Sequence, residues 1–524
     1  MERTLPALGG AVNYDFIAQR AALTPDRPAV WFEDRWYSYR EMNHRAQQLA
    51  VQLHAHDIRK GDRVGILALN HLAHIDLILA APKLGFIYTP FNYRLATAEQ
   101  QELAAYVEPK LMLYESQFEH AAVQMNDPRM DLKEYAAWLQ AKPDPGRYIP
   151  PVLDPEDTHM ILFTGGSTGL PKGAMLPYRQ TFFNAVNTVF SWGLRDSDCA
   201  IQATPAFHAA INVLATPLLM LGGRVVLPPA FDAGHYLRLA LEHQATLLFM
   251  VPTMFQMLAE HPDFASADLR CVRWAISGGA PCPEPVRRHF ADKGVRFKQG
   301  YGLTEAGVNC FAMEIEDAEQ RPTSVGKPVL NTQAVIRQPD GLPVSPGEVG
   351  ELTLAGPHVF TGYWQRPQET AEALRDGWLW TGDLARQDED GFYYIAGRRK
   401  EMFISGGENV FPVEIESALY ALPEVAECAV IGVPDTRWGE VGLAAVALRP
   451  GHPANAQSLR EALCPRLARY KLPAHFMFLQ ALPKSGAGKI LKPEIRRLYE
   501  AEHTKTTIEP VRTERDHVTQ RTHQ

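Results

Sequence analysis

Short apolar runs alternate with amphipathic stretches along most of this chain, and this alternation limits its fold more than any other feature. Strand-like runs at 63–69 and 110–115 neighbour helical stretches at 40–53 and 74–85. After Asp198 the pattern returns, with strand-like runs at 199–205, 224–228, 245–252, 271–279 and 295–302, and helices near 211–220, 234–243 and 284–292. Strands joined through helices form parallel sheets. We therefore predict an α/β fold with two parallel-rich sheets.

The helix after residue 96 has a more specific start signal. Thr97 followed by Gln100, ahead of an apolar run, has the pattern of a capping box. In such a box the threonine hydroxyl accepts a backbone N–H while the later side chain reaches back to the cap. We predict that Thr97 caps this helix.

The length and the changes of pattern predict more than one domain. A chain of 524 residues exceeds the size at which one hydrophobic core stops growing. Short strands with Gly/Pro turns between 324 and 395 predict a small β-barrel-like unit, and a separate α+β pattern begins after 397–401. We predict an N-terminal domain over 1–399, a smaller mobile α+β C-terminal domain over 400–501, and a polar, disordered tail over 502–524.

Charge and cysteine usage narrow the class of partner and compartment. The formal net charge is -8 and no long Lys/Arg block is present, which argues against nucleic acid as a partner. Six cysteines without a C-x-x-C pair suggest neither disulfides nor a zinc site. No signal-peptide pattern and no apolar run of about 18 residues is present. We expect a cytoplasmic protein without a membrane span; the sequence leaves the oligomeric state open and allows a homodimer.

The stretch "FTGGSTGLPKGAML", from Phe163 to Leu176, is rich in groups that bind phosphate. It is not a Walker loop, because Pro171 precedes Lys172 and Gly173 follows it. Glycine N–H groups, hydroxyls and the lysine ammonium could still cradle a polyphosphate. A plain Gly-rich hairpin turn between the two flanking apolar strands explains the same residues. The loop alone leaves both interpretations open.

Three further stretches decide between them. These are "QGYGLTEAG" at 299–307, "WLWTGDLARQDEDGFYYIAGRRKEMFISGGENVFPVEIE" at 378–416, and "LPKSGAGKILK" at 482–492. With the Gly-rich loop, they resemble, in order, the motifs of the adenylate-forming superfamily of acyl-CoA synthetases, luciferases and peptide-synthetase adenylation domains. The resemblance covers nearly the whole chain. Within this superfamily, the sequence is most similar to fatty-acyl and aryl-CoA ligases.

The resemblance implies an enzyme that works in two half-reactions. A hydrophobic carboxylic acid, medium- or long-chain fatty or aromatic, attacks the α-phosphorus of MgATP to give acyl-AMP and pyrophosphate. Coenzyme A then displaces AMP to give acyl-CoA. ATP, Mg²⁺ and coenzyme A are the implied cofactor and co-substrates. Rival readings are adenylation for a carrier protein or another acceptor, a non-catalytic nucleotide-binding paralogue, and a kinase that would produce ADP.

The resemblance also implies residue roles. Lys489 is expected to bridge the substrate carboxylate and the α-phosphate, Glu305 to bind Mg²⁺, Thr304 to contact phosphate, and His208 to lie near the reacting carboxylate. The nucleotide-binding set is Thr164, Gly165, Gly166, Ser167, Thr168, Gly169, Lys172, Gly278, Gly279, Ala280, Tyr301, Gly302, Asp383 and Arg398. The hinge is Lys400, the coenzyme A tunnel is Ser405, Gly406 and Gly407, and the acyl pocket is Phe207, Ala209, Ala210, Ile211 and Val308.

Overall fold

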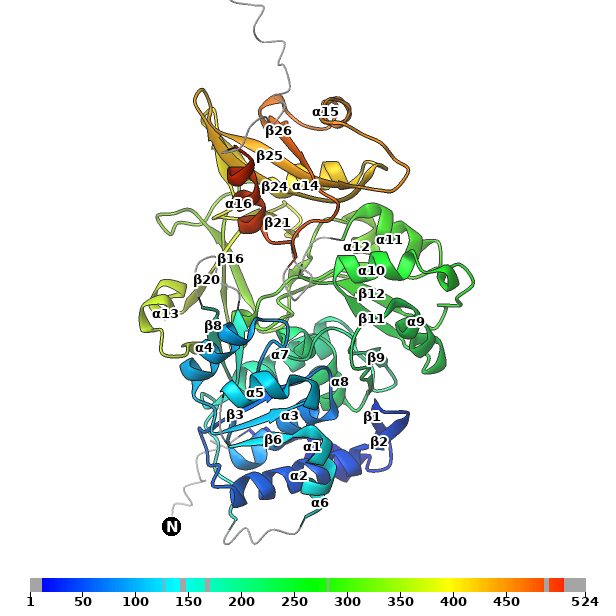
Figure 1. Cartoon of the computed structure of the whole chain (residues 1–524), viewed down its shortest axis with the longest axis vertical. Coiled ribbons are helices and arrows are strands. Elements are labelled where there is room, and N and C mark those ends of the chain that lie inside the picture. Colours follow the sequence, from blue (N-terminus) through cyan, green and yellow to red (C-terminus); the bar gives the residue numbers. More distant parts are fainter. Residues whose placement is uncertain are drawn as a thin grey trace, which may run out of the picture.

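The computed structural model describes residues 12–125, 128–141, 148–164, 170–279, 282–484 and 490–503. It has a large lower part built on three sheets and a smaller upper part built on one (Figure 1). The helices are α1 (Phe16–Leu23), α2 (Tyr39–Ala55), α3 (Leu72–Leu84), α4 (Thr97–Val107), α5 (Glu119–Met125), α6 (Tyr135–Gln140), α7 (Tyr178–Ser191), α8 (Ala215–Leu221), α9 (Ala233–Glu242), α10 (Pro252–Ala259), α11 (Glu284–Ala291), α12 (Ile315–Gln320), α13 (Pro367–Ala373), α14 (Pro412–Tyr420), α15 (Ala456–Leu463) and α16 (Lys492–His503).

The first sheet is mostly parallel and has the order β18-β8-β7-β4-β3-β5-β6. Its strands are β3 (Arg63–Leu67), β4 (Ile87–Pro90), β5 (Leu111–Tyr114), β6 (Arg129–Asp131), β7 (Thr158–Thr164), β8 (Lys172–Pro177) and β18 (Gly362–Tyr363). Helix α3 lies between β3 and β4 in the chain, as the alternation predicts. The strands β7, β8 and β18 pair antiparallel at one edge. The Gly-rich stretch therefore joins two antiparallel strands.

The second sheet has the order β13-β12-β11-β9-β10-β1-β2, and only the terminal pair β1 and β2 is antiparallel. Its strands are β1 (Pro28–Phe32), β2 (Arg35–Ser38), β9 (Cys199–Ile201), β10 (Arg224–Val226), β11 (Leu247–Met250), β12 (Trp274–Ser277) and β13 (Phe297–Gln299). Each of the five strand-like runs after Asp198 contains one of these strands. The predicted pair of parallel-rich sheets is confirmed.

The third sheet is antiparallel and contains β16 (Gln333–Arg337), β17 (Gly350–Ala355), β19 (Leu374–Arg375), β20 (Trp378–Gln387) and β21 (Tyr393–Arg398). A two-stranded pair, β14 (Phe311–Ala312) and β15 (Lys327–Pro328), precedes it. One continuous hydrophobic core joins all three sheets, with Met160, Trp274 and Leu352 among its buried residues. The β unit therefore packs as part of the large lower body.

The upper part is built on a mixed sheet of β22 (Phe403–Ser405), β23 (Glu408–Val410), β24 (Val425–Asp435), β25 (Gly439–Leu448) and β26 (His475–Phe478). Two separate cores contain only residues from 403 onward. They lie on opposite faces of the long hairpin β24–β25, because alternate residues such as Val430 and Ile431 belong to different cores. This separation supports the division at 399/400, which stays a prediction.

The predicted cap of α4 is wrong by one residue. Thr97 is the first helical residue and Ala96 is the N-cap, whose N–H donates to Glu99 Oε2 at 2.9 Å. Alanine has no side-chain acceptor, so only half of the capping interaction forms. Gln100 instead lies buried and donates from its amide to the carbonyl of Asn92. The sequence pattern does not distinguish these two registers.

Candidate active site

The Gly-rich loop is held at its two ends by a pair of antiparallel strands. Thr164 ends β7 and Lys172 begins β8, and the two residues face each other across the pair. The hydroxyl of Thr164 donates to the carbonyl of Lys172 at 3.4 Å. The loop residues that we assign to phosphate binding, namely Gly165, Gly166, Ser167, Thr168 and Gly169, lie outside the described residues. The hairpin interpretation is confirmed for the two strands, and a phosphate cradle at their tip is compatible with it.

Two neighbouring parallel strands deliver the next group of predicted site residues. Strands β12 and β13 are paired, with Ser277 opposite Gln299, so their carboxyl ends lie side by side. Gly278 follows the first strand, and Tyr301 closely follows the second. The N–H of Gly300 donates to the carbonyl of Ser277 at 2.8 Å and holds the ends of the two strands together. Ligands of open α/β sheets bind at such strand ends.

Glycine is required at two of these positions for different reasons. Gly279 has a φ of +81°, a conformation that few other residues adopt without strain. A Cβ on Gly302 would lie 2.1 Å from the carbonyl oxygen of Val308, so the loop from 302 to 308 folds back on this glycine. Gly278 packs against Phe249, whose ring a Cβ would meet at 2.8 Å. Ala280 lies outside the described residues.

Asp383 forms the centre of a small hydrogen-bonded cluster. It lies on β20 directly opposite Arg398 on β21, and the Arg398 Nε is 2.6 Å from its Oδ1. The hydroxyl of Tyr301 donates to Asp383 Oδ2 at 2.6 Å. Burial raises the pKa of Tyr301 well above its ordinary value, and the charge of Asp383 adds to the effect, so this hydroxyl stays a donor. A carboxylate has about four acceptor positions, so one carboxylate can hold several donors at once.

Arg398 links this cluster to Glu305. Burial alone would lower the pKa of Arg398, but the negative charge of Asp383 outweighs it, with smaller contributions from Tyr301, Glu305 and Glu401, and the pKa is raised. Its side chain is 47% exposed, whereas Asp383 is 3% exposed. The Arg398 guanidinium is therefore the solvent-exposed side of this cluster, and the Asp383 carboxylate is its buried side.

Glu305 lies in a short 3₁₀ turn, Thr304–Ala306, and has a partner that the sequence did not reveal. The hydroxyl of Tyr363 donates to Glu305 Oε1 at 2.8 Å. The carbonyl of Thr304 accepts a hydrogen bond from the side chain of Gln180 on α7 at 2.8 Å. The 58 positions between Glu305 and Tyr363 carry no periodicity that would predict this contact.

His208 lies at the start of the predicted acyl pocket. Its ring centre is 4.4 Å from that of Phe207, which meets the ring of Tyr93 edge-on at 5.2 Å. A 3₁₀ turn over Ala209–Asn212 follows, and Ile211 is fully buried in it. Phe207 and Ile211 thus contribute to the packed wall of this region.

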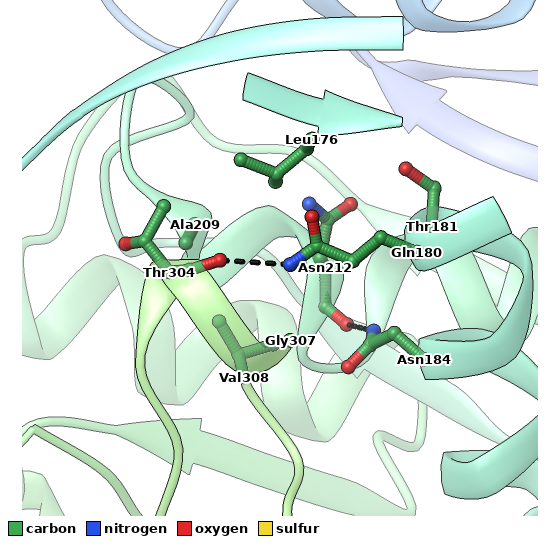
Figure 2. A pocket seen from close by; sticks show the side chains of 9 residues that line it. All are labelled: Leu176, Gln180, Thr181, Asn184, Ala209, Asn212, Thr304, Gly307 and Val308. Carbon is green, nitrogen blue, oxygen red and sulfur yellow. Dashed lines mark hydrogen bonds between the residues drawn. The ribbon is translucent and has the colours of Figure 1, made fainter. Parts of the chain in front are cut away.

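A small pocket lies between α7 and the turn after Thr304 (Figure 2). It is lined by Leu176, Gln180, Thr181, Asn184, Ala209, Asn212, Thr304, Gly307 and Val308, and its cavity measures about 10 Å³. The amide oxygens of Gln180 and Asn184 meet no hydrogen-bond donor among the described residues. The sequence led us to expect a roomy apolar lining around Ala209 and Val308. This cavity is small and mostly apolar atoms line it, although α7 also directs the amide groups of Gln180 and Asn184 toward it.

The remaining predicted residues lie beyond β21. Lys400 is exposed two residues after that strand ends, next to Arg399, whose Nη1 contacts Glu351 at 2.9 Å. Gly406 and Gly407 form a two-residue turn between β22 and β23, with φ values of +62° and +90°. Such φ values are those of a type I′ hairpin turn. Lys489 lies outside the described residues.

Two family models match the chain. Residues 17–364 match the AMP-binding enzyme family, and residues 414–489 match the AMP-binding enzyme C-terminal domain. The chain belongs to the AMP-binding enzyme family. The match of the larger model includes Lys172, Tyr301 and Glu305, while Asp383 and Arg398 lie between the two matched ranges.

Relatives within this family match over the full length. A feruloyl-CoA synthase from an Amycolatopsis species is 40% identical over 92% of this chain and 98% of its own. The o-succinylbenzoate CoA synthetase of Bacillus subtilis, solved with its acyl-adenylate intermediate, is 29% identical with a TM-score of 0.84 and covers 95% of this chain and 99% of its own. The same enzyme in complex with ATP and a magnesium ion is 30% identical, with a TM-score of 0.83 and coverage of 92% and 99%.

No described helix is long and apolar enough to cross a membrane.

Proposed function

We propose that this protein is an AMP-forming aryl-CoA synthetase, which activates an aromatic monocarboxylic acid and transfers it to coenzyme A. One observation carries the nucleotide half of the proposal: two motifs far apart in sequence, at 299–307 and 378–416, converge in one cluster. Tyr301 binds Asp383, Asp383 binds Arg398, and the charge of Glu305 also acts on Arg398. The preference for an aromatic acid is supported by the 40% identity to a feruloyl-CoA synthase along nearly the whole chain.

The buried carboxylate suits the sugar of a nucleotide. The Asp383 carboxylate, held by Tyr301 and Arg398, is a group of the kind that accepts hydrogen bonds from ribose hydroxyls. The exposed Arg398 adds a donor at the mouth of the site. Gly278 and Gly279 lie in the turn that we assign to the base, and the positive φ of Gly279 allows this turn to be tight. We assign these residues to AMP binding.

Lys172, Thr304 and Glu305 are our candidates for binding phosphate and Mg²⁺. Lys172 provides a cation at the base of the Gly-rich hairpin, and Thr304 provides a hydroxyl. Glu305 fits a magnesium ligand, because its hydrogen bond from Tyr363 uses Oε1 and a hard cation prefers carboxylate oxygen. Bound there, Mg²⁺ would neutralise charge on the phosphates as pyrophosphate leaves. We assign Lys489 to the reacting carboxylate, Lys400 to the hinge, and the turn after Ser405 to the coenzyme A tunnel.

The first test is AMP release from MgATP over a panel of benzoic, cinnamic, hydroxycinnamic, medium-chain and long-chain acids, each with and without coenzyme A. The proposal expects AMP that depends on both an aromatic acid and coenzyme A. AMP release only with fatty acids would contradict the aromatic preference. Pyrophosphate exchange that coenzyme A does not affect would mean another acceptor, and ADP as the product would mean a kinase.

A lysine pair tests the division of labour between the half-reactions. Lys489→Ala should abolish adenylation and spare thioester formation from supplied acyl-adenylate, since that lysine is assigned to the first step only. Lys484→Ala is the matched control, because Lys484 forms an ion pair with Glu427. Equal loss of both half-reactions in Lys489→Ala would contradict the assignment.

We further propose a cytoplasmic location. All six cysteines are free thiols, five of them wholly or partly buried and Cys464 exposed. An exposed free thiol is typical of a reducing compartment. Fractionation of cells that express the tagged full-length chain would test this directly.

A further inference from the structure

The segment from Phe360 to Trp364 ties together two parts of the proposed site. The N–H of Phe360 donates to the carbonyl of Glu305 at 2.8 Å, and the N–H of Trp364 donates to the carbonyl of Gly173 at 2.7 Å. Between these two contacts lies the short strand β18, paired with β8 just after Lys172. The backbone thus joins the turn that carries Glu305 to the strand that leaves the Gly-rich loop.

Tyr363 contacts a functional group on each side of this junction. Its hydroxyl donates to Glu305 Oε1 at 2.8 Å, and the ammonium nitrogen of Lys172 lies 4.8 Å from the centre of its ring. An ionised carboxylate can only accept, so in this contact the Tyr363 hydroxyl is the donor. The residue is 9% exposed, which protects both contacts from water.

We propose that Tyr363 is a positioning residue that sets the geometry of the magnesium-binding carboxylate and the phosphate-binding lysine together. This inference rests on the proposed function, in which Glu305 binds Mg²⁺ and Lys172 binds phosphate. The hydrogen bond fixes Oε1 of Glu305, so that Oε2 would be the oxygen that binds Mg²⁺. The ring face attracts the lysine ammonium and limits the positions that its flexible stem can reach. One side chain therefore sets the distance between two opposite charges.

A packing role alone would use different atoms. The ring of Tyr363 meets that of Phe360 edge-on at 4.9 Å, and this contact needs no hydroxyl. Tyr363→Phe removes only the hydroxyl, whereas Tyr363→Leu also removes the ring face. The two substitutions therefore separate the contact to Glu305 from the contact to Lys172. A packing residue would tolerate the first substitution without any change in metal dependence.

The experiment measures the dissociation constant of ATP for the full-length chain, by calorimetry, in the presence of Mg²⁺ and in the presence of EDTA. For Tyr363→Phe we expect binding of MgATP to weaken roughly tenfold, because a hydrogen bond to a charged group is lost, while binding of metal-free ATP stays unchanged. For Tyr363→Leu we expect metal-free ATP to bind about threefold more weakly as well. The magnesium concentration that gives half-maximal pyrophosphate exchange should rise in both variants.

Tyr394→Phe is the matched control. The hydroxyl of Tyr394 also donates to a carboxylate, Asp388 Oδ2, at 2.9 Å, but this pair lies outside the proposed site. It should leave both dissociation constants unchanged. Equal binding of MgATP by wild type and Tyr363→Phe would overturn the inference, and so would a loss that is the same with Mg²⁺ and with EDTA. Because phenylalanine keeps the ring, Tyr363→Phe tests the inference even if Tyr363→Leu fails to fold.

Failure of the proposed function gives a different result. A wild-type protein that binds MgATP but forms no AMP with any acid would refute the synthetase assignment. The difference between Mg²⁺ and EDTA in Tyr363→Phe would still decide the role of Tyr363. A wild-type protein that binds no ATP would overturn both.

Discussion

The ammonium nitrogen of Lys492 lies 2.7 Å from Glu401 Oε2, although the two residues are 91 positions apart in the chain. It also lies 2.8 Å from Glu416 Oε1 on α14. Lys492 begins α16 three positions after Lys489, and Glu401 directly follows the proposed hinge residue Lys400. A single lysine thus fastens the segment after the hinge to the segment after the proposed catalytic lysine.

Replacing this lysine should destabilise the C-terminal part. Lys492→Met leaves two carboxylates facing each other without their cation. The Lys492 side chain is 19% exposed, so we expect the free energy of unfolding to fall by about 2 kcal/mol, less than for a fully buried pair. Thermal unfolding measured at neutral pH checks this. Arg497→Met, which breaks an exposed ion pair on the same helix, is the control and should shift the unfolding temperature much less. Equal shifts in the two variants would contradict the special role of Lys492.

Buried histidines should make the protein sensitive to mild acid. Burial lowers the pKa of His159 to about 4 and that of His71 to about 4. The unfolded chain therefore binds a proton at each site as the pH falls below about 6.5, while the folded protein does not until about pH 4. The free energy of unfolding accordingly falls with pH across this window, by about 2 kcal/mol per group at pH 5.

His159→Gln isolates one of these groups. Glutamine can keep a contact to Thr181 or Ile78 but cannot titrate, so we expect the loss of stability between pH 7.5 and pH 5 to be about 2 kcal/mol smaller than in the wild type. Urea unfolding at the two pH values measures the difference. His120→Gln, at an exposed position, is the control. An unchanged pH dependence in His159→Gln would show that other groups cause the acid sensitivity.

Gly302→Ala should damage the site while leaving the rest of the fold in place. The added methyl would lie 2.1 Å from the carbonyl oxygen of Val308, so the loop over 302–308 must open and carry Thr304 and Glu305 with it. A shift of about 1 Å at reacting groups costs roughly a hundredfold in rate, and we expect that fall in AMP formation. The control is Gly442→Ala, whose methyl would approach neighbours no closer than 3.4 Å. Near-normal activity of Gly302→Ala would show that the loop tolerates rearrangement.

Asp383→Asn should weaken nucleotide binding. An asparagine offers one acceptor oxygen in place of two and carries no charge to hold Arg398. We expect AMP to bind roughly tenfold more weakly, as measured by calorimetry. The control Asp388→Asn alters a similar Tyr–Asp–Arg group, with Tyr394 and Arg321, away from the site. If both variants bound AMP like the wild type, the ribose assignment of Asp383 would be wrong.

Local sequence patterns predicted the regular elements well, because the periodicity of apolar side chains directly reflects which face is buried. The five strand-like runs after Asp198 each hold a strand, and the helix over 74–85 is present as α3. The cap of α4 was predicted at Thr97 instead of Ala96, because Glu99 and Gln100 are both capable of reaching back. This error shows that a local sequence pattern predicts the presence of a helix more reliably than the residue at which the helix begins.

The sequence by itself determined the fold class, the family and the identity of Glu305, Asp383 and Arg398 as site candidates, since strand and helix periodicity and short motifs are properties of neighbouring residues. Only the tertiary structure decided which side chains complete those candidates. Tyr301 meets Asp383 across 82 positions, and Tyr363 meets Glu305 across 58. Sheet pairing and helix packing bring such residues together, and a hydrogen bond between them forms only when both backbones are already in place.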